Sequence, residues 1–119
     1  MANPNIVAVS DIRGKVSTQA VGTTYTSIVT CATDTIVKVN TLQITNINAS
    51  DFNGTISARI NKSSGTDARI ADEIVIPDAS SLVLISKDSS IYLEEGDALE
   101  LLANDTGYLE ATCSYEIIS

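Results

Sequence analysis

The sequence predicts an all-β protein: an antiparallel β-sandwich of about eight strands, with a jelly-roll or an immunoglobulin-like arrangement. Three observations support this fold class. Ile, Val and Thr dominate the chain, and their β-branched side chains favour a pleated strand over a helix. Apolar residues recur with a period of two, and turn residues interrupt the pattern about every 8–12 positions. No stretch shows the periodicity of a helix longer than one turn.

The chain of 119 residues is long enough for one hydrophobic core but too short for two. We therefore expect a single β-sandwich domain over residues 12–119, preceded by an extended N-terminal arm over residues 1–11. This arm either reaches a neighbouring subunit as an added strand or docks loosely on its own domain.

Most of the expected strands follow from simple alternation of apolar and polar residues. The clearest is the last one, in which Leu109, Ala111 and Cys113 share one face with Tyr115 and Ile117. Because this strand runs almost to the final residue, we expect the C-terminus to be tied into a sheet. The expected strands cover residues 12–21, 25–32, 35–47, 55–61, 68–76, 81–86, 91–93, 98–103 and 108–117.

The alternation changes phase within residues 35–47. Val37 and Val39 set one phase, whereas Leu42 and Ile44 fall on the opposite one. A single strand face cannot serve both pairs, because a shift of one residue turns every side chain to the other side of the sheet. The sequence therefore predicts a bulge or bend near Asn40, or a strand that passes from one sheet to the other.

Two further strands depart from plain alternation. Asp72 interrupts the apolar face of residues 68–76, and an inward charge of this kind is typical of a sheet edge. Residues 82–85 are apolar without alternation, which is typical of a strand covered on both sides. We expect the other sheet to cover one side and a neighbouring subunit to cover the other.

The charge distribution excludes several classes of partner. The net charge is −8, and residues 88–119 contain eight acidic residues and no Lys or Arg. Such a surface repels nucleic-acid backbones and anionic lipid, so we expect no nucleic-acid partner and no membrane partner. The acidic surface is expected to face solvent. The alternatives are a contact with a basic partner and a Ca²⁺ site built from turn residues, with candidate ligands Glu94, Glu95, Asp97 and Asp105.

The residues needed for common catalytic sites are missing from the sequence. The chain contains no histidine, which excludes serine and cysteine catalytic triads that use this base. It has no glycine-rich phosphate loop and no cysteine spacing suited to zinc. We therefore expect no enzyme activity, no catalytic residue, no cofactor and no metal site.

Cys31 and Cys113 are the two cysteines of the chain. Each falls within a strand-like alternation, so we expect buried free thiols. The alternative is a disulfide between two facing strands, whose geometry the sequence does not supply.

Apolar residues make up 44% of the chain, and several short runs place them on both sides of a strand. A small two-layer sandwich cannot bury all of them, and large exposed apolar patches mark interaction surfaces. We therefore expect a homo-oligomer, such as a trimer or a ring, because identical copies cover such patches economically. The candidate interface residues are Ile6, Val7, Val9, Val83, Ile85 and Leu102.

A carbohydrate-binding module is the competing hypothesis from another class of function, because small jelly-roll sandwiches also occur as lectin domains. Sugar sites need exposed aromatic platforms, and Tyr25, Tyr92 and Tyr108 are the candidates in this chain. Each of them is equally well explained as a half-buried strand residue.

Three segments carry a resemblance to a known group of proteins: residues 76–87 (IPDASSLVLISK), residues 91–99 (IYLEEGDAL) and residues 111–119 (ATCSYEIIS). Together with residues 5–15, they resemble small β-sandwich virion structural proteins of tailed bacteriophages, and the marine cyanophage group in particular. The resemblance implies a non-catalytic component of the virion, assembled in the host cytoplasm. It also implies a major capsid, neck or tail protein as partner. A capsid decoration or cement protein on the particle surface is the expected placement, and a neck or tail-fibre attachment ring is the alternative.

Overall fold

The computed structural model describes residues 11–48 and 52–119 and confirms an all-β sandwich. All the strand pairs in the described chain are antiparallel, and one 3₁₀ turn, η2 (Lys87–Ser89), is present. The strands are β1 (Ile12–Ala20), β2 (Thr26–Thr30), β3 (Ile36–Asn46), β4 (Gly54–Asn61), β5 (Ala68–Ile76), β6 (Ser81–Ile85), β7 (Ile91–Leu93), β8 (Ala98–Ala103) and β9 (Leu109–Ile118).

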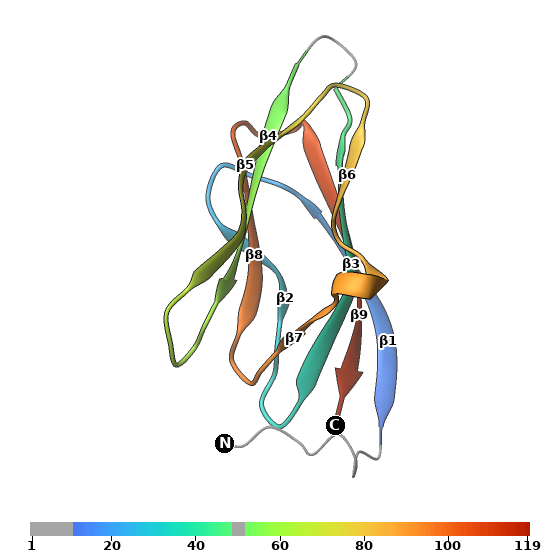
Figure 1. Ribbon diagram of the computed structural model, residues 1–119, viewed down its shortest axis with the longest axis vertical. Helices are drawn as coiled ribbons and strands as arrows, with labels where there is room; N and C mark the ends of the chain where they lie inside the picture. Colours follow the sequence, from blue (N-terminus) through green and yellow to red (C-terminus); the bar gives the residue numbers. More distant parts are fainter. Residues whose placement is uncertain (1–10, 49–51) are drawn as a thin grey trace.

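The strands form two sheets packed face to face (Figure 1). The five-stranded sheet has the order β1-β9-β3-β6, with β7 also paired to β3, and the four-stranded sheet has the order β2-β8-β4-β5. Four strand pairs are nested inside one another along the chain: β1–β9, β2–β8, β3–β6 and β4–β5. They form in effect one long hairpin, and rolling this hairpin up brings β9 beside β3 and β8 beside β4. This nesting makes the sandwich a jelly roll rather than an immunoglobulin-like fold.

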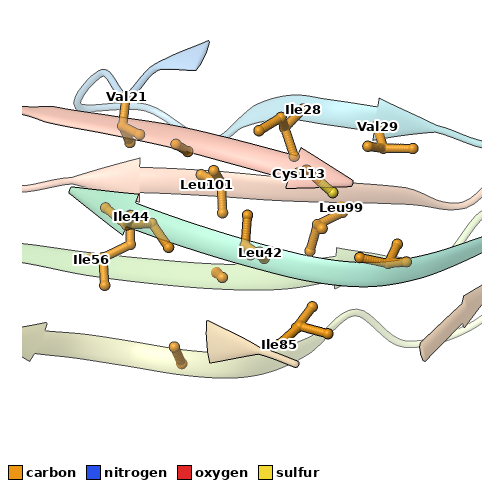
Figure 2. Packing of buried hydrophobic residues seen from close by; sticks show 14 of the residues in the cluster. Val21, Ile28, Val29, Leu42, Ile44, Ile56, Ile85, Leu99, Leu101 and Cys113 are labelled. Atoms are coloured by element: carbon orange, nitrogen blue, oxygen red, sulfur yellow. The ribbon is translucent and has the colours of Figure 1, made fainter. Parts of the chain in front are cut away.

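The core lies between the two sheets and is built from alternate residues of each strand. Leu42 and Ile44 of β3, Ile56 of β4 and Leu99 and Leu101 of β8 are all 0% exposed. Figure 2 shows their side chains converging from both sheets. Each such side chain contributes about 1.5–3 kcal/mol by leaving water, so the alternation read in the sequence is also the main source of stability.

The phase change predicted in β3 is confirmed as a bulge. The pairing of β3 with β9 shifts between Val39 and Thr41, so that one extra residue is inserted at Asn40. As a result Val37 and Val39 before the bulge point into the same core as Leu42 and Ile44 after it, and all four are at most 1% exposed.

The predicted sheet edge at β5 is confirmed, but Asp72 does not point inward: its side chain is 56% exposed and pairs with Arg69. β5 is the outer strand of the four-stranded sheet, and its pairing with β4 shifts at two places near Asp72. Glu73, the next residue, has a φ of 50°, which is unusual for a residue other than glycine. Irregular backbone of this kind keeps a sheet edge from pairing with another chain.

The apolar run at residues 82–85 has a different explanation from the predicted double cover. β6 is an edge strand, and only its inner side is covered by the described part of the chain, because Val83 on the outer side is 54% exposed. The pairing with β3 shifts between Leu42 and Gln43, which places an extra residue, Leu84, beside Ile85. The bulge thus brings two consecutive apolar residues against the core.

The C-terminus is tied into the five-stranded sheet, as predicted. Backbone hydrogen bonds run from the Asp11 N–H to the Ser119 carbonyl at 3.1 Å and from the Ser119 N–H to the Asp11 carbonyl at 3.0 Å. Pairing therefore begins at Asp11, one residue before the predicted start of the sandwich domain. The rest of the predicted N-terminal arm lies outside the described residues.

Gly96 and Gly107 offer a matched test of how the β7–β8 turn is packed. Both have positive φ, 85° and 87°. A Cβ added at Gly96 would lie 2.8 Å from the Cβ of Ser63, whereas one added at Gly107 would meet nothing within 4 Å. We expect Gly107→Ala to lower the free energy of unfolding by about 1 kcal/mol through backbone strain alone. Gly96→Ala should lower it by about 2–4 kcal/mol, because strain and steric clash add.

Urea denaturation of the two glycine variants measures this difference directly. Equal losses of stability would show that Ser63 moves aside without cost and that the turn is not tightly packed against it.

Candidate functional site

The structure separates the residues predicted to form an interface. Ile6, Val7 and Val9 lie outside the described residues. Val83 is exposed on the outer face of the five-stranded sheet. Leu102 is half-buried on the outer face of the four-stranded sheet, opposite Ser57. The described candidates therefore do not form one continuous surface.

The prediction for Ile85 is wrong. Its side chain is 3% exposed and lies in the core, because Ile85 pairs with Leu42, an inward residue of β3. The β6 bulge that turns Ile85 inward leaves no mark in a run of consecutive apolar residues.

The outer face of the five-stranded sheet carries a band without charged side chains. Two rows of paired residues that run across the strands make it up. One row runs from Val16 through Ser114 to Thr41, and the other runs from Thr18 through Thr112 and Gln43 to Val83. Rows with charged residues border it on both sides, with Glu116 and Lys38 on one and Glu110 on the other. We call this surface the uncharged band, and it consists of Val16, Thr18, Thr41, Gln43, Val83, Thr112 and Ser114.

Apolar side chains stand at both ends of the uncharged band. Val16 is 62% exposed on β1, and Val83 is 54% exposed on β6. Ile12 and Tyr92, on the same face, are also more than half exposed. A sheet surface with small neutral side chains and no charge to desolvate suits contact with another protein surface.

Val16 was not singled out by the sequence, although it is the most exposed of the large apolar residues of the described chain. Alternation in β1 separates Val16 from Ser17 and Gln19 but does not say which set faces the core. In the structure, Ser17 Oγ donates to the Ile28 carbonyl at 2.8 Å and Gln19 Nε2 donates to the Ser27 carbonyl at 3.0 Å. These bonds to β2 turn the polar set toward the inside and leave Val16 outside.

The outer face of the four-stranded sheet is polar. The Arg59 guanidinium carbon lies 4.0 Å from the centre of the Tyr25 ring, and Arg59 Nε donates to Glu100 Oε1 at 2.7 Å. Glu100 also accepts a hydrogen bond from Asn61 Nδ2 at 3.2 Å. The hydrogen bond to Glu100 raises the pKa of Arg59, so the guanidinium stays charged. One face of Tyr25 is therefore occupied by a cation within the protein.

A shallow hollow of about 240 Å³ lies next to this group. Arg69 Nη1 donates to Asp72 Oδ1 at 2.9 Å, and the Glu73 N–H donates to Ser57 Oγ at 2.9 Å, which holds the irregular backbone of β5. The hollow therefore has acidic and basic side chains beside one aromatic ring, that of Tyr25. The residues lining the hollow are Tyr25, Ser57, Arg69, Asp72, Glu73 and Leu102.

The three tyrosines considered as sugar platforms are not brought together. Tyr25 lines the hollow on the four-stranded sheet, whereas Tyr92 is exposed on the outer face of the other sheet. Tyr108 packs against Phe52, with ring centres 4.2 Å apart. Tyr25 is the one that lines this hollow, together with Arg69, Asp72 and Glu73.

The acidic turn considered as a Ca²⁺ site is held by a lysine. Lys62 Nζ donates to Asp97 Oδ2 at 2.7 Å and to Glu94 Oε1 at 2.8 Å. The N–H groups of Ser63 and Glu94 also donate to the Asp97 carboxylate. Asp97 is 1% exposed. Burial alone would raise its pKa, but the hydrogen bonds from Lys62 and the two N–H groups outweigh burial and lower it.

This arrangement ties the β7–β8 turn to the β4–β5 loop. Within residues 11–48 and 52–119, no group of three or more His, Cys, Asp or Glu side chains is arranged to hold a metal ion. Two of the four candidate ligands, Glu94 and Asp97, instead serve as acceptors for Lys62.

The prediction of buried free thiols is confirmed. Cys31 and Cys113 are both buried and are not joined to each other. Burial raises the pKa of the Cys113 thiol to about 12, so this group stays protonated and unreactive at neutral pH.

Comparison with known proteins adds no relative. A scan against protein-family models found no match, and a search of the curated proteins found none. The part of the chain that the structure describes contains no helix that is long and apolar enough to cross a membrane. What the fold and surface define is a jelly-roll domain with an uncharged band on one outer face and a cluster of paired charges around Tyr25 on the other.

Asp97→Asn tests the turn that Lys62 holds. The substitution removes the negative charge opposite Lys62, and we expect the free energy of unfolding at neutral pH to fall by about 2 kcal/mol. The folded-state pKa of Asp97 lies below its ordinary value of 3.8, so its contribution is complete above that pH. The contribution is lost as the pH falls through the folded-state pKa. The stability difference between wild type and variant should therefore shrink in acid.

Chemical denaturation at a series of pH values measures this difference, and Asp88→Asn, at an exposed position in η2, is the control. A difference that persists unchanged in acid, or an equal effect of the control, would contradict the assignment.

Proposed function

We propose that this chain is a non-catalytic structural protein of a tailed-bacteriophage particle, mounted on the capsid surface as a decoration or cement component and assembled as a homo-oligomer. The uncharged band is the observation that carries the proposal. It is a surface without charged side chains, with exposed Val16 and Val83 at its two ends, on a protein whose net charge is −8. Leaving the two valines in water is unfavourable, and covering the band with protein desolvates no charged side chain.

Two further observations support the particle assignment. Jelly-roll sandwiches are a common architecture of viral capsid and lectin domains. The segments at residues 76–87, 91–99 and 111–119 resemble virion proteins of tailed phages, and in the structure they supply β6, β7 and most of β9 and the start of β8. The acidic surplus of the C-terminal quarter keeps a surface-mounted protein soluble and discourages contact with packaged nucleic acid. A neck ring or a tail-fibre attachment ring would use the same face.

Mass spectrometry of purified particles from the culture that produces this chain tests the placement. Hundreds of copies per particle indicate capsid decoration, whereas six or twelve copies, as cyclic symmetry gives, indicate a neck or tail ring. Absence of the chain from purified particles would overturn the proposal.

Val83→Lys and Val75→Lys form a matched pair for the proposed contact face. Both valines are 54% exposed, but Val83 lies on the uncharged band and Val75 lies on β5 of the opposite sheet. Each lysine sits in solvent in the free protein, so neither should change the melting temperature by more than about 2 °C. We expect Val83→Lys to lower incorporation into particles at least tenfold, because burying an unpaired ammonium costs more than about 1.4 kcal/mol. Incorporation of Val75→Lys should stay at the wild-type level.

Quantitative immunoblotting of purified particles measures both variants. Wild-type incorporation of Val83→Lys would show that the uncharged band is not the contact face.

Carbohydrate binding is the second candidate function, and the hollow around Tyr25 is the observation that favours it. Sugars are bound by one aromatic face together with charged side chains that offer planar hydrogen-bonding groups. Arg69, Asp72 and Glu73 supply such groups beside Tyr25. A bound sugar ring would have to use the part of Tyr25 that Arg59 leaves open.

A glycan array with wild type, Tyr25→Ala and Tyr92→Ala tests this second function. If the hollow binds sugar, Tyr25→Ala abolishes the signal and Tyr92→Ala keeps it, since Tyr92 lies on the other sheet. No wild-type signal on the array, or equal signals for all three proteins, would reject the carbohydrate site.

A further inference from the structure

The free edges of the two sheets differ in their capacity to pair with another strand. β2 is short and its pairing shifts between Ser27 and Val29. β5 contains two shifts and the positive φ of Glu73. β6 and β7 are five and three residues long and are separated by η2. β1, by contrast, is nine residues long and pairs with β9 without any shift. It is the outer strand of the five-stranded sheet (Figure 1, blue).

The backbone groups of β1 that face the open edge can be identified from its pairing with β9. Asp11 and Ser119 exchange two hydrogen bonds, so the N–H and C=O of Asp11 point toward β9. The Val21 N–H likewise bonds to the Leu109 carbonyl at 2.9 Å. Because N–H and C=O directions alternate along an antiparallel strand, the odd-numbered residues between them also point toward β9. The residues whose N–H and C=O groups point to the open edge are therefore Ile12, Gly14, Val16, Thr18 and Ala20.

The neighbouring edge, β2, is closed by β1 itself. The hydrogen bonds from Ser17 Oγ to the Ile28 carbonyl and from Gln19 Nε2 to the Ser27 carbonyl occupy two carbonyl groups of β2. No backbone hydrogen bond covers the open edge of β1 among the described residues. A long, regular edge without a bulge is a template for pairing with another chain.

We propose that β1 pairs antiparallel with β1 of a second copy of this chain, about a two-fold axis that passes beside Val16 perpendicular to the sheet. Val16 is the middle residue of β1 and would face its own counterpart. The five edge-facing residues would then each meet an edge-facing residue of the second copy and exchange both hydrogen bonds with it. This proposal deepens the proposed function and rests on it for the biological role of the dimer, because it names the self-association surface.

The charges of β1 favour this register. With Val16 at the centre, Arg13 lies opposite Gln19 and Lys15 lies opposite Ser17 of the second copy, so no two like charges are directly opposed. With Lys15 at the centre, two lysines face each other. With Gly14 at the centre, Arg13 faces Lys15. Centres beyond Val16 shorten the paired segment, so the longest register is also the one without direct repulsion.

The two-fold pairing would join two five-stranded sheets into one continuous sheet. The outer faces of both copies would lie on the same side, because the axis is perpendicular to the sheet. Val16 of each copy, which is 62% exposed in the single chain, would be covered by its counterpart at the centre. The Val16 rows of the two uncharged bands would run into each other, whereas the Thr18 row of each copy would continue into the Gly14 row of the other.

Cysteine substitution tests both the pairing and its register. In the proposed dimer of the Val16→Cys variant, the two introduced thiols face each other at a Cα separation of about 5.5 Å, within reach of a disulfide. Thr18→Cys, on the same face of the same strand, is the matched control. Its two introduced thiols would stand four residues apart along the strand, about 13 Å, which is too far for a disulfide. The native Cys31 and Cys113 are buried and do not interfere.

Size-exclusion chromatography with light scattering at micromolar concentration should give twice the 12.5 kDa chain mass for wild type. Oxidation should cross-link Val16→Cys and leave Thr18→Cys uncross-linked. Val16→Lys should lower the mass to that of one chain, because it places two ammonium groups face to face, whereas Val83→Lys should leave the dimer intact.

A monomeric wild type would overturn the proposal. So would a dimer in which the Val16→Cys variant fails to cross-link, or in which the Thr18→Cys variant cross-links equally well. These outcomes bear on self-association and leave the proposed place in a phage particle untouched, since they concern the purified chain. Absence from purified particles, in turn, would reject the proposed function while the dimer measurement still stands.

Discussion

The bulge in β3 is the constraint on which the rest of the sandwich depends. β3 pairs with β9 on one side and with both β6 and β7 on the other, so it joins most of the five-stranded sheet. A strand with an unbroken period of two would turn either Val37 and Val39 or Leu42 and Ile44 to solvent. Each side chain exposed in this way would forfeit about 1.5–3 kcal/mol. The extra residue at Asn40 keeps both pairs in the core.

Much of the fold could be predicted from the sequence, because alternation reports directly on which residues share a face. The β3 bulge was predictable for the same reason, since a phase change within one strand has few physical solutions. The β6 bulge was not, because a run of four apolar residues has no phase to change. Alternation in β1 also does not say which of its two faces points to the core. The hydrogen bonds of Ser17 and Gln19 to β2 decide this.

The candidate surfaces were harder to predict than the fold, because each depends on contacts between distant parts of the chain. The placement of Ile85 in the core follows from a register shift against β3. The role of Asp97 follows from Lys62, which lies 35 positions away in the sequence. The pairing of Arg59 with Tyr25 and Glu100 joins three separate segments. Composition limited the possible chemistry, but only the three-dimensional arrangement could identify the uncharged band.

The nested strand pairing has a consequence for how the protein is made. β1 emerges from the ribosome early, yet its partner β9 is the last strand of the described chain, and Ile12 pairs with Ile118. The contacts that complete the five-stranded sheet therefore span almost all of the described residues, and loop closure over such distances slows folding. Until β9 is synthesised, both edges of β1 lack a partner and are open to premature association. The nascent chain is most exposed to misassembly in this interval, when a holding chaperone would have the greatest effect.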